Sequence, residues 1–181
     1  MKEKKAFKKY RGKPLSLRFE ILGNEILKYC KTTNTEVNMC QSSFYTYKGK
    51  EGEKICVACL CGHLAYLFNN KRIPKHWIDD NDEELEFNCT HPFVEGAKIV
   101  DDILFDNHQS LEDWADKHPN MWGNNMGKSV FRGSLAFNYP GRNDEGDYRG
   151  QPKIKLEDIG QHFLDVSKRI IKAKASSLDY S

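Results

Sequence analysis

The amino-acid sequence predicts a mainly α-helical protein: a single domain of roughly five or six helices, with room for a small β-hairpin. Three observations support this fold class. Apolar residues recur at helical spacing along much of the chain, most regularly between Leu156 and Ile170. Capping residues and prolines stand where the expected helices begin. The length of 181 residues is enough for one domain with a sizeable core.

At the N-terminus we expect a basic flexible arm over residues 1–13, followed by the helical domain over residues 14–181. Residues 2–13 contain seven Lys or Arg and one Glu. Short basic tails are commonly solvated, but they can also contact phosphate groups. Nucleic acid is therefore one partner class that this arm would suit.

The first apolar stretch does not resemble a secretion signal, because Arg18 and Glu20 interrupt it. No other stretch reaches the roughly 20 apolar residues that a membrane-spanning helix needs. We therefore expect no membrane partner, a cytoplasmic location, and six cysteines held as reduced thiols.

The first expected helix opens at Pro14 and ends near Cys30, because apolar residues follow helical spacing between them. Residues 36–47 are rich in β-prone types and partly alternate, which is compatible with a short strand or hairpin. A turn containing Gly, Lys and Glu over residues 48–53 leads into residues 55–69, around which we expect the core to be built.

Residues 55–69 are predicted to form a central buried helix. Wound at about 100° per residue, this stretch is apolar on both faces, which is typical of a helix inside a core. Cys56, Cys59 and His63 then share one face. Three interpretations of these residues remain open. In the first, the cysteines are small apolar side chains that pack the core.

The second interpretation is a zinc site, whereas no other cofactor is expected. Cys56 and Cys59 would supply one ligand pair, His63 would lie one turn further on, and Cys89 with His91 would supply a second pair. Thiolate and imidazole suit tetrahedral zinc, although the second pair is spaced more closely than in most zinc sites. The zinc would be structural in a closed site and catalytic if one position stays open.

The third interpretation is a cysteine nucleophile of a hydrolase. Cys59 or Cys61 near a helix N-terminus would have a lowered pKa. The required general base would come from another part of the chain, and the candidates are His91, His108 and His118.

The second half of the chain predicts three further helices. Thr90 is suited to cap one helix, and Ser110 with Asp113 forms a capping-box-like pair that opens another, which must stop before Pro119. The terminal helix carries the cleanest amphipathic stripe of the chain. Its buried face consists of Leu156, Ile159, Phe163, Val166 and Ile170.

Two motif classes are excluded by their spacing. The acidic run over residues 79–86 lacks the Gly and Glu that a calcium loop places at its sixth and twelfth positions. The run Gly127-Lys128-Ser129 lacks the earlier glycine of a phosphate-binding loop, because position 122 is Trp122.

The segment over residues 138–152 is the expected partner-binding loop. Loops of this length inside compact domains are usually functional or disordered. It is rich in Tyr and Arg, which are enriched at protein interfaces. The expected contact residues are Trp122, Tyr139, Arg142, Tyr148 and Arg149.

The run Cys59-Leu-Cys-Gly62-His63, the segment Ile103-Leu-Phe105 and the helix from Leu156 together resemble a group of small uncharacterised prokaryotic and phage proteins. In that group a cysteine-containing helix with a Cys-x-x-Gly-His or Cys-x-x-Gly-Trp core is followed by a Phe- and Leu-rich helix and a closing amphipathic helix. The chain departs from the group where Lys54-Ile55-Cys56 replaces a Cys-Gly-Thr run. The resemblance brings no established activity.

The sequence therefore favours a non-enzymatic interaction protein of prokaryotic or phage type. It would bind a macromolecular partner, most plausibly a protein, through the 138–152 loop. A zinc-binding domain and a cysteine-dependent hydrolase are the two alternatives.

Overall fold

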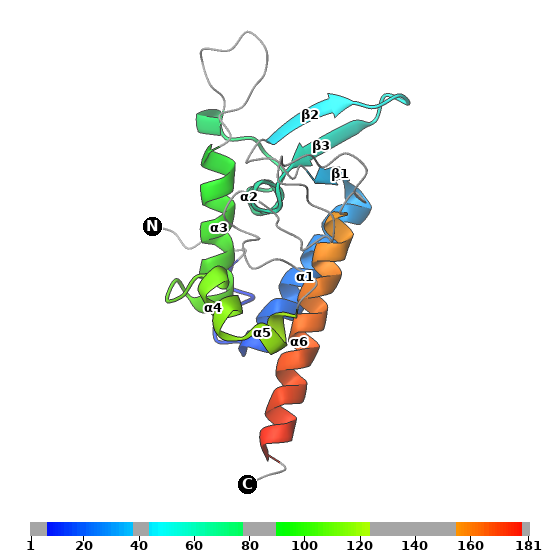
Figure 1. The fold of residues 1–181 in the computed structure, drawn as a ribbon. Coiled ribbons are helices and arrows are strands. Elements are labelled where there is room, and N and C mark those ends of the chain that lie inside the picture. Colours follow the sequence, from blue (N-terminus) through cyan, green and yellow to red (C-terminus); the bar gives the residue numbers. More distant parts are fainter. Residues whose placement is uncertain (1–6, 38–43, 78–89, 124–154, 179–181) are drawn as a thin grey trace, which may run out of the picture.

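The computed structural model describes residues 7–37, 44–77, 90–123 and 155–178. This part of the chain is mainly helical and carries one small sheet, as the sequence predicts (Figure 1). Six α-helices, a short 3-10 helix and three strands make up the described residues. In chain order they are α1 (Leu15–Thr32), β1 (Asn34–Val37), β2 (Phe44–Lys48), β3 (Lys54–Ala58), α2 (Leu60–Phe68), η2 (Lys75–Trp77), α3 (Thr90–Phe105), α4 (Leu111–Lys117), α5 (Pro119–Trp122) and α6 (Leu156–Leu178).

The sheet has the strand order β1-β3-β2. β1 runs parallel to β3, and β2 runs antiparallel to it. β2 and β3 form the small hairpin, closed by a turn in which the Gly49 amide donates to the Glu53 carbonyl at 2.8 Å. The sequence placed the hairpin within residues 36–47, whereas its second strand comes from residues that we expected to be helical.

The predicted helix over residues 55–69 is therefore wrong in its first turn. Cys56, Val57 and Ala58 lie in β3, and α2 starts only at Leu60, with Cys59 as its N-cap. β3 is the central strand and its last three residues are all buried. A strand covered on both faces is a continuous apolar run, and such a run looks like a buried helix in sequence.

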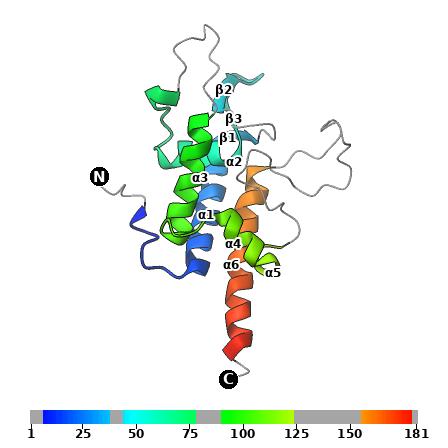
Figure 2. The same ribbon diagram turned by 60° about the vertical axis from the view of Figure 1, so that its left-hand side comes forward.

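α1 and α6 pack side by side along most of the body (Figures 1 and 2). The predicted stripe of α6 is confirmed, because every residue from Leu156 to Ile170 in that stripe is buried. The two helices touch where Gly23 faces Gly160: a Cβ at Gly23 would lie 2.8 Å from the Gly160 carbonyl oxygen. Glycine at this point lets the two backbones approach closely.

α2 lies against α3 through a second glycine contact. A Cβ at Gly96 would overlap the carbonyl group of Cys61, so α3 approaches the α2 backbone without any side chain between them. This contact fixes α2 in the middle of the molecule, between α3 and the α1 layer (Figure 1).

Residues 7–13 pack on the body, although we expected them to belong to a flexible arm. Tyr10 is only 2% exposed, and Phe7 stacks on Phe68 at the end of α2. Lys9 forms an ion pair with Glu25 of α1. The aromatic residues of this segment are the reason for its position, because they bury apolar area that a free arm would leave in water.

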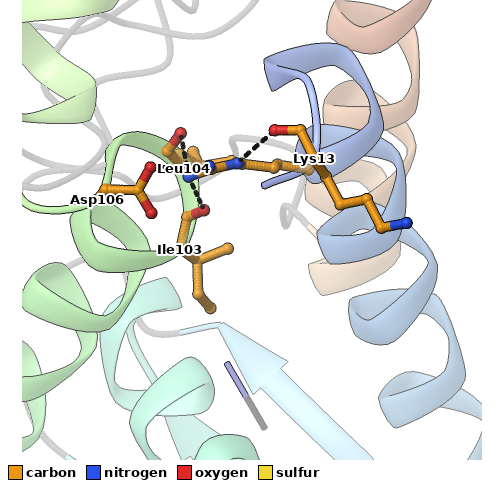
Figure 3. A network of polar contacts seen from close by, with 5 residues as sticks. Lys13, Ile103, Leu104 and Asp106 are labelled. Carbon is orange, nitrogen blue, oxygen red and sulfur yellow. Dashed lines mark hydrogen bonds and ion pairs between the residues drawn. The ribbon is translucent and has the colours of Figure 1, made fainter. Parts of the chain in front are cut away.

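Arg18 joins this N-terminal segment to the end of α3 through its hydrogen bonds to Lys13, Ile103 and Leu104, the residues labelled with Asp106 in Figure 3. Its side chain is buried and donates to the carbonyls of Lys13 (2.8 Å), Ile103 (3.2 Å) and Leu104 (3.4 Å). It also pairs with Asp106 at 2.7 Å. The last carbonyls of a helix have no hydrogen-bond donor within the helix, and they carry partial negative charge. A buried guanidinium at this end supplies both the missing donors and a compensating positive charge.

Candidate functional site

His63 lies at the junction of α1, α2 and β1, and is 1% exposed. Its Nε2 lies 2.8 Å from the Glu36 carbonyl oxygen, and its Nδ1 lies 3.3 Å from the Tyr29 hydroxyl. A carbonyl oxygen can only accept, so Nε2 carries the proton and the Tyr29 hydroxyl donates to Nδ1. Both ring nitrogens are therefore engaged in the fold.

Burial keeps this imidazole neutral. It lowers the pKa of His63 to about 4, and the hydrogen bond to the Glu36 carbonyl opposes that shift only in part. Burial likewise raises the pKa of the Tyr29 hydroxyl. His63 and Tyr29 are therefore both neutral, and their hydrogen bonds link α1, α2 and β1.

Lys71 covers the same junction from outside. Its ammonium donates to the Thr32 and Thr33 hydroxyls at 2.9 and 2.8 Å, and lies 5.4 Å from the centre of the Tyr29 ring. The backbone of Lys71 has a φ of 57°, in the left-handed region that residues other than Gly and Asn seldom adopt. The interactions with the end of α1 offset this strain.

The residues proposed as zinc ligands do not share a helix face. Cys56 is buried in β3, and the Cys59 thiol caps α2 by accepting from the Gly62 amide at 3.4 Å. Cys89 and the side chain of His91 lie outside the described residues. Among the side chains that are described, no group of three or more His, Cys, Asp or Glu could hold a metal ion.

Among the described side chains, no contact joins a cysteine to a histidine proposed for a cysteine hydrolase. Cys61 is buried in α2, and burial raises its pKa, which is the opposite of what a nucleophilic thiolate needs. His118 stacks on Trp114, and its Nδ1 lies 2.8 Å from the Trp114 carbonyl oxygen. His108 is exposed beyond the end of α3.

Trp122, which we expected to contact a partner, is buried in the core. It is 2% exposed and packs edge-on against His162, with ring centres 4.6 Å apart. Its carbonyl accepts from Arg169 at 2.8 Å. Large aromatic residues serve cores as well as interfaces, and sequence alone does not separate the two uses. Tyr139, Arg142, Tyr148 and Arg149 lie outside the described residues.

The outer edge of β2 is the feature of the described structure that is best suited to a partner. Neighbouring residues of an antiparallel strand alternate between pairs that exchange hydrogen bonds and pairs that do not. The bond from the Gly49 amide to the Glu53 carbonyl, with the register of the hairpin, makes Tyr47 and Tyr45 the hydrogen-bonded positions toward β3. The backbone groups of Phe44, Thr46 and Lys48 therefore point outward, and no strand among the described residues pairs with them.

The far end of α6 is a second exposed feature. Residues 171–176 are all exposed, and this part of the helix extends beyond the other elements (Figures 1 and 2). Ile171 is 52% exposed, and Lys168, Lys172 and Lys174 give this end a positive charge.

Sequence reasoning missed the partners of His63 and the role of Arg18. The Glu36 contact uses a backbone carbonyl, for which side-chain patterns give no signal. Arg18 does carry a signal: it lies three residues after Leu15 and four before Leu22, on the apolar face of α1. A charged residue at such a position indicates a buried, paired group.

The described residues form a mainly helical fold with a three-stranded mixed sheet whose edge strands are β1 and β2. Comparisons of the chain with family models, curated proteins and solved structures found no match. Within the described ranges, none of the helices has the length and apolar character to cross a bilayer.

Proposed function

We propose that the chain is a non-enzymatic interaction protein that binds a protein partner by strand addition at the outer edge of β2. The 138–152 loop remains the predicted second contact. The observation that carries the proposal is the outward direction of the backbone groups of Phe44, Thr46 and Lys48, which have no strand beside them in the described structure.

A polypeptide backbone is the natural complement of these groups. An extended peptide can pair with an exposed strand through main-chain hydrogen bonds, and its side chains then give selectivity. Nucleic acid offers no such ladder, so this edge favours a protein partner. The other edge of the sheet differs, because His63 already occupies the Glu36 carbonyl of β1.

The two chemical alternatives receive less support from the same structure. The imidazole of His63 and the thiol of Cys59 both take part in hydrogen bonds that hold the fold together. Using them as metal ligands or as a catalytic pair would break those bonds. The interaction role uses backbone groups of β2 that no other described strand pairs with.

The test is selection from a library of displayed peptides. The variant Thr46→Pro removes an outward-facing amide and leaves the ladder to β3 intact, since proline is tolerated at such edge positions. The matched control Thr46→Val keeps the amide and the branched side chain. We expect peptides captured by the wild type to be captured by Thr46→Val and lost with Thr46→Pro.

Equal capture by wild type and Thr46→Pro would contradict the proposal, as would the absence of any selected peptide with a chain that is monomeric. Circular dichroism of both variants shows whether the fold is retained. A double change, Tyr148→Ala with Arg149→Ala, tests the loop separately, because weaker capture by this variant would assign the loop a share of the contact.

A further inference from the structure

We infer that the partner at this edge is a second copy of the chain, so that β2 of each copy pairs with β2 of the other about a two-fold axis at Thr46. This inference rests on the proposed function and names the occupant of the edge. The result would be a continuous six-stranded sheet across a symmetric dimer.

The register follows from the direction of the backbone groups. Only residues whose amides and carbonyls point at the new neighbour exchange hydrogen bonds with it in an antiparallel pair. In β2 these are Phe44, Thr46 and Lys48. They are symmetric about Thr46, so the register that engages all three places Thr46 opposite Thr46 and Phe44 opposite Lys48.

This register places no like charges opposite each other. Lys48 is the only charged residue of β2, and the two Lys48 residues stand at opposite ends of the paired strands. Thr facing Thr is a favourable cross-strand pair. A partner of different sequence would need to supply the same match, whereas a second copy supplies it by symmetry.

The other edge of the sheet, at β1, is where pairing beyond two copies would have to continue. An open edge on both sides would let the sheet grow without limit, which is the usual hazard of exposed strands. At β1 the carbonyl of Glu36 is taken by Nε2 of His63. Pairing through β2 uses the open edge of each copy and leaves only the β1 edges outside.

Among the described elements, the position of the hairpin leaves room for this arrangement. β2 lies on the outer side of the sheet, and the tip of the β2–β3 hairpin extends away from the helices (Figure 1). In the second view β2 again lies at the periphery of the molecule (Figure 2).

Sedimentation equilibrium of the full chain over a wide concentration range tests the inference. We expect dimers for the wild type and for Thr46→Val, and at least a tenfold weaker association for Thr46→Pro. A wild type that stays monomeric throughout, or an unchanged dimer in a folded Thr46→Pro, would overturn it.

Disulfide trapping tests the register independently of folding defects. Residues in a hydrogen-bonded antiparallel pair have Cα atoms about 5.5 Å apart, within the range that a disulfide spans. Thr46→Cys should therefore give a covalent dimer under mild oxidation, beyond any background of the wild type. Lys48→Cys is the matched control and should not, because the two Lys48 positions lie far apart. The reverse pattern would overturn the register.

The two proposals fail in distinguishable ways. A monomeric chain that still captures peptides through Thr46 would overturn the dimer and leave the interaction role standing. A monomeric chain that captures no peptide would overturn both.

Discussion

At the scale of single residues, His63 and His162 make stability depend on pH. Burial lowers the pKa of each to about 4, and the nearby Arg169 charge adds to the shift of His162. In the unfolded chain a histidine has a pKa of about 6.5. Between these values the unfolded chain binds protons that the folded chain does not.

We therefore expect the free energy of unfolding to be highest above about pH 6.5 and to fall as the pH drops toward 4. The slope is at most about 1.4 kcal/mol per pH unit for each histidine. Urea unfolding at pH 7 and pH 5 measures it. Nε2 of His162 is buried and has no hydrogen-bond partner within the described ranges, so His162→Phe should reduce the slope while the fold is retained. A pH-independent stability would contradict this account.

Arg18 gives a residue-scale prediction that separates burial from charge pairing. Arg18→Met would leave the carbonyls of Ile103 and Leu104 without their donor, and we expect a loss of about 3 kcal/mol in unfolding free energy. Asp106→Asn removes only the more exposed partner and should lose less than about 1 kcal/mol. Denaturant unfolding of both variants compares them. Equal losses would show that the ion pair dominates.

The hydrogen bonds of His63 also predict how the protein responds to a chelator. Both of its ring nitrogens serve the fold, so removal of divalent metal should leave the midpoint of thermal unfolding unchanged. Elemental analysis of protein purified without a metal-affinity step is the companion measurement. A result of one equivalent of zinc, lost together with the fold, would instead support the zinc site predicted at Cys56, Cys59, Cys89 and His91.

At the scale of elements, the helices with clear ends were predictable. Ser110 caps α4 by accepting from the Asp113 amide at 3.1 Å, as its sequence pattern indicates, and α3 begins at Thr90. The stretch over residues 55–58 was not predictable, because local pattern does not distinguish a central strand from a buried helix. Only the pairing with β1 and β2 decides it, and that pairing joins residues distant in sequence.

The close contact between α2 and α3 depends on Gly96, which has only a hydrogen atom as its side chain. Gly96→Ala would drive a methyl group into the Cys61 carbonyl, so the two helices would have to separate. We expect a loss of about 3 kcal/mol, the upper range for overpacking. Lys98→Ala, an exposed position of the same helix, should change stability by no more than about 0.5 kcal/mol. Thermal unfolding of the two variants gives the comparison, and similar midpoints would contradict the close approach.

At the scale of the whole molecule, the fold class was predictable and the candidate site was not. The mainly helical class follows from periodicities that each segment carries by itself. The open edge of β2 depends on which strand lies beside which, and the role of Arg18 depends on the end of α3, 85 residues further along the chain. Properties that depend on contacts between residues far apart in the chain are only weakly indicated by the local sequence.

Protection from hydrogen exchange should vary along α6 in step with this architecture. Amides between Ile159 and Ile170 lie on the packed part of the helix and should exchange slowly. Amides beyond residue 171 belong to exposed turns that open locally, so we expect exchange at least a hundredfold faster there. Exchange followed by mass spectrometry or NMR reads both regions. Uniform protection along the helix would indicate that a partner covers its end.

The packing of α1 on α6 has a consequence for synthesis of the chain. Leu22 and Ile26 are synthesised long before α6, the helix that covers them. During that interval the apolar face of α1 must be shielded by other nascent segments or by a chaperone, since exposed apolar surface promotes aggregation. The nascent chain would complete its core only when the segment around Gly160 emerges and meets Gly23.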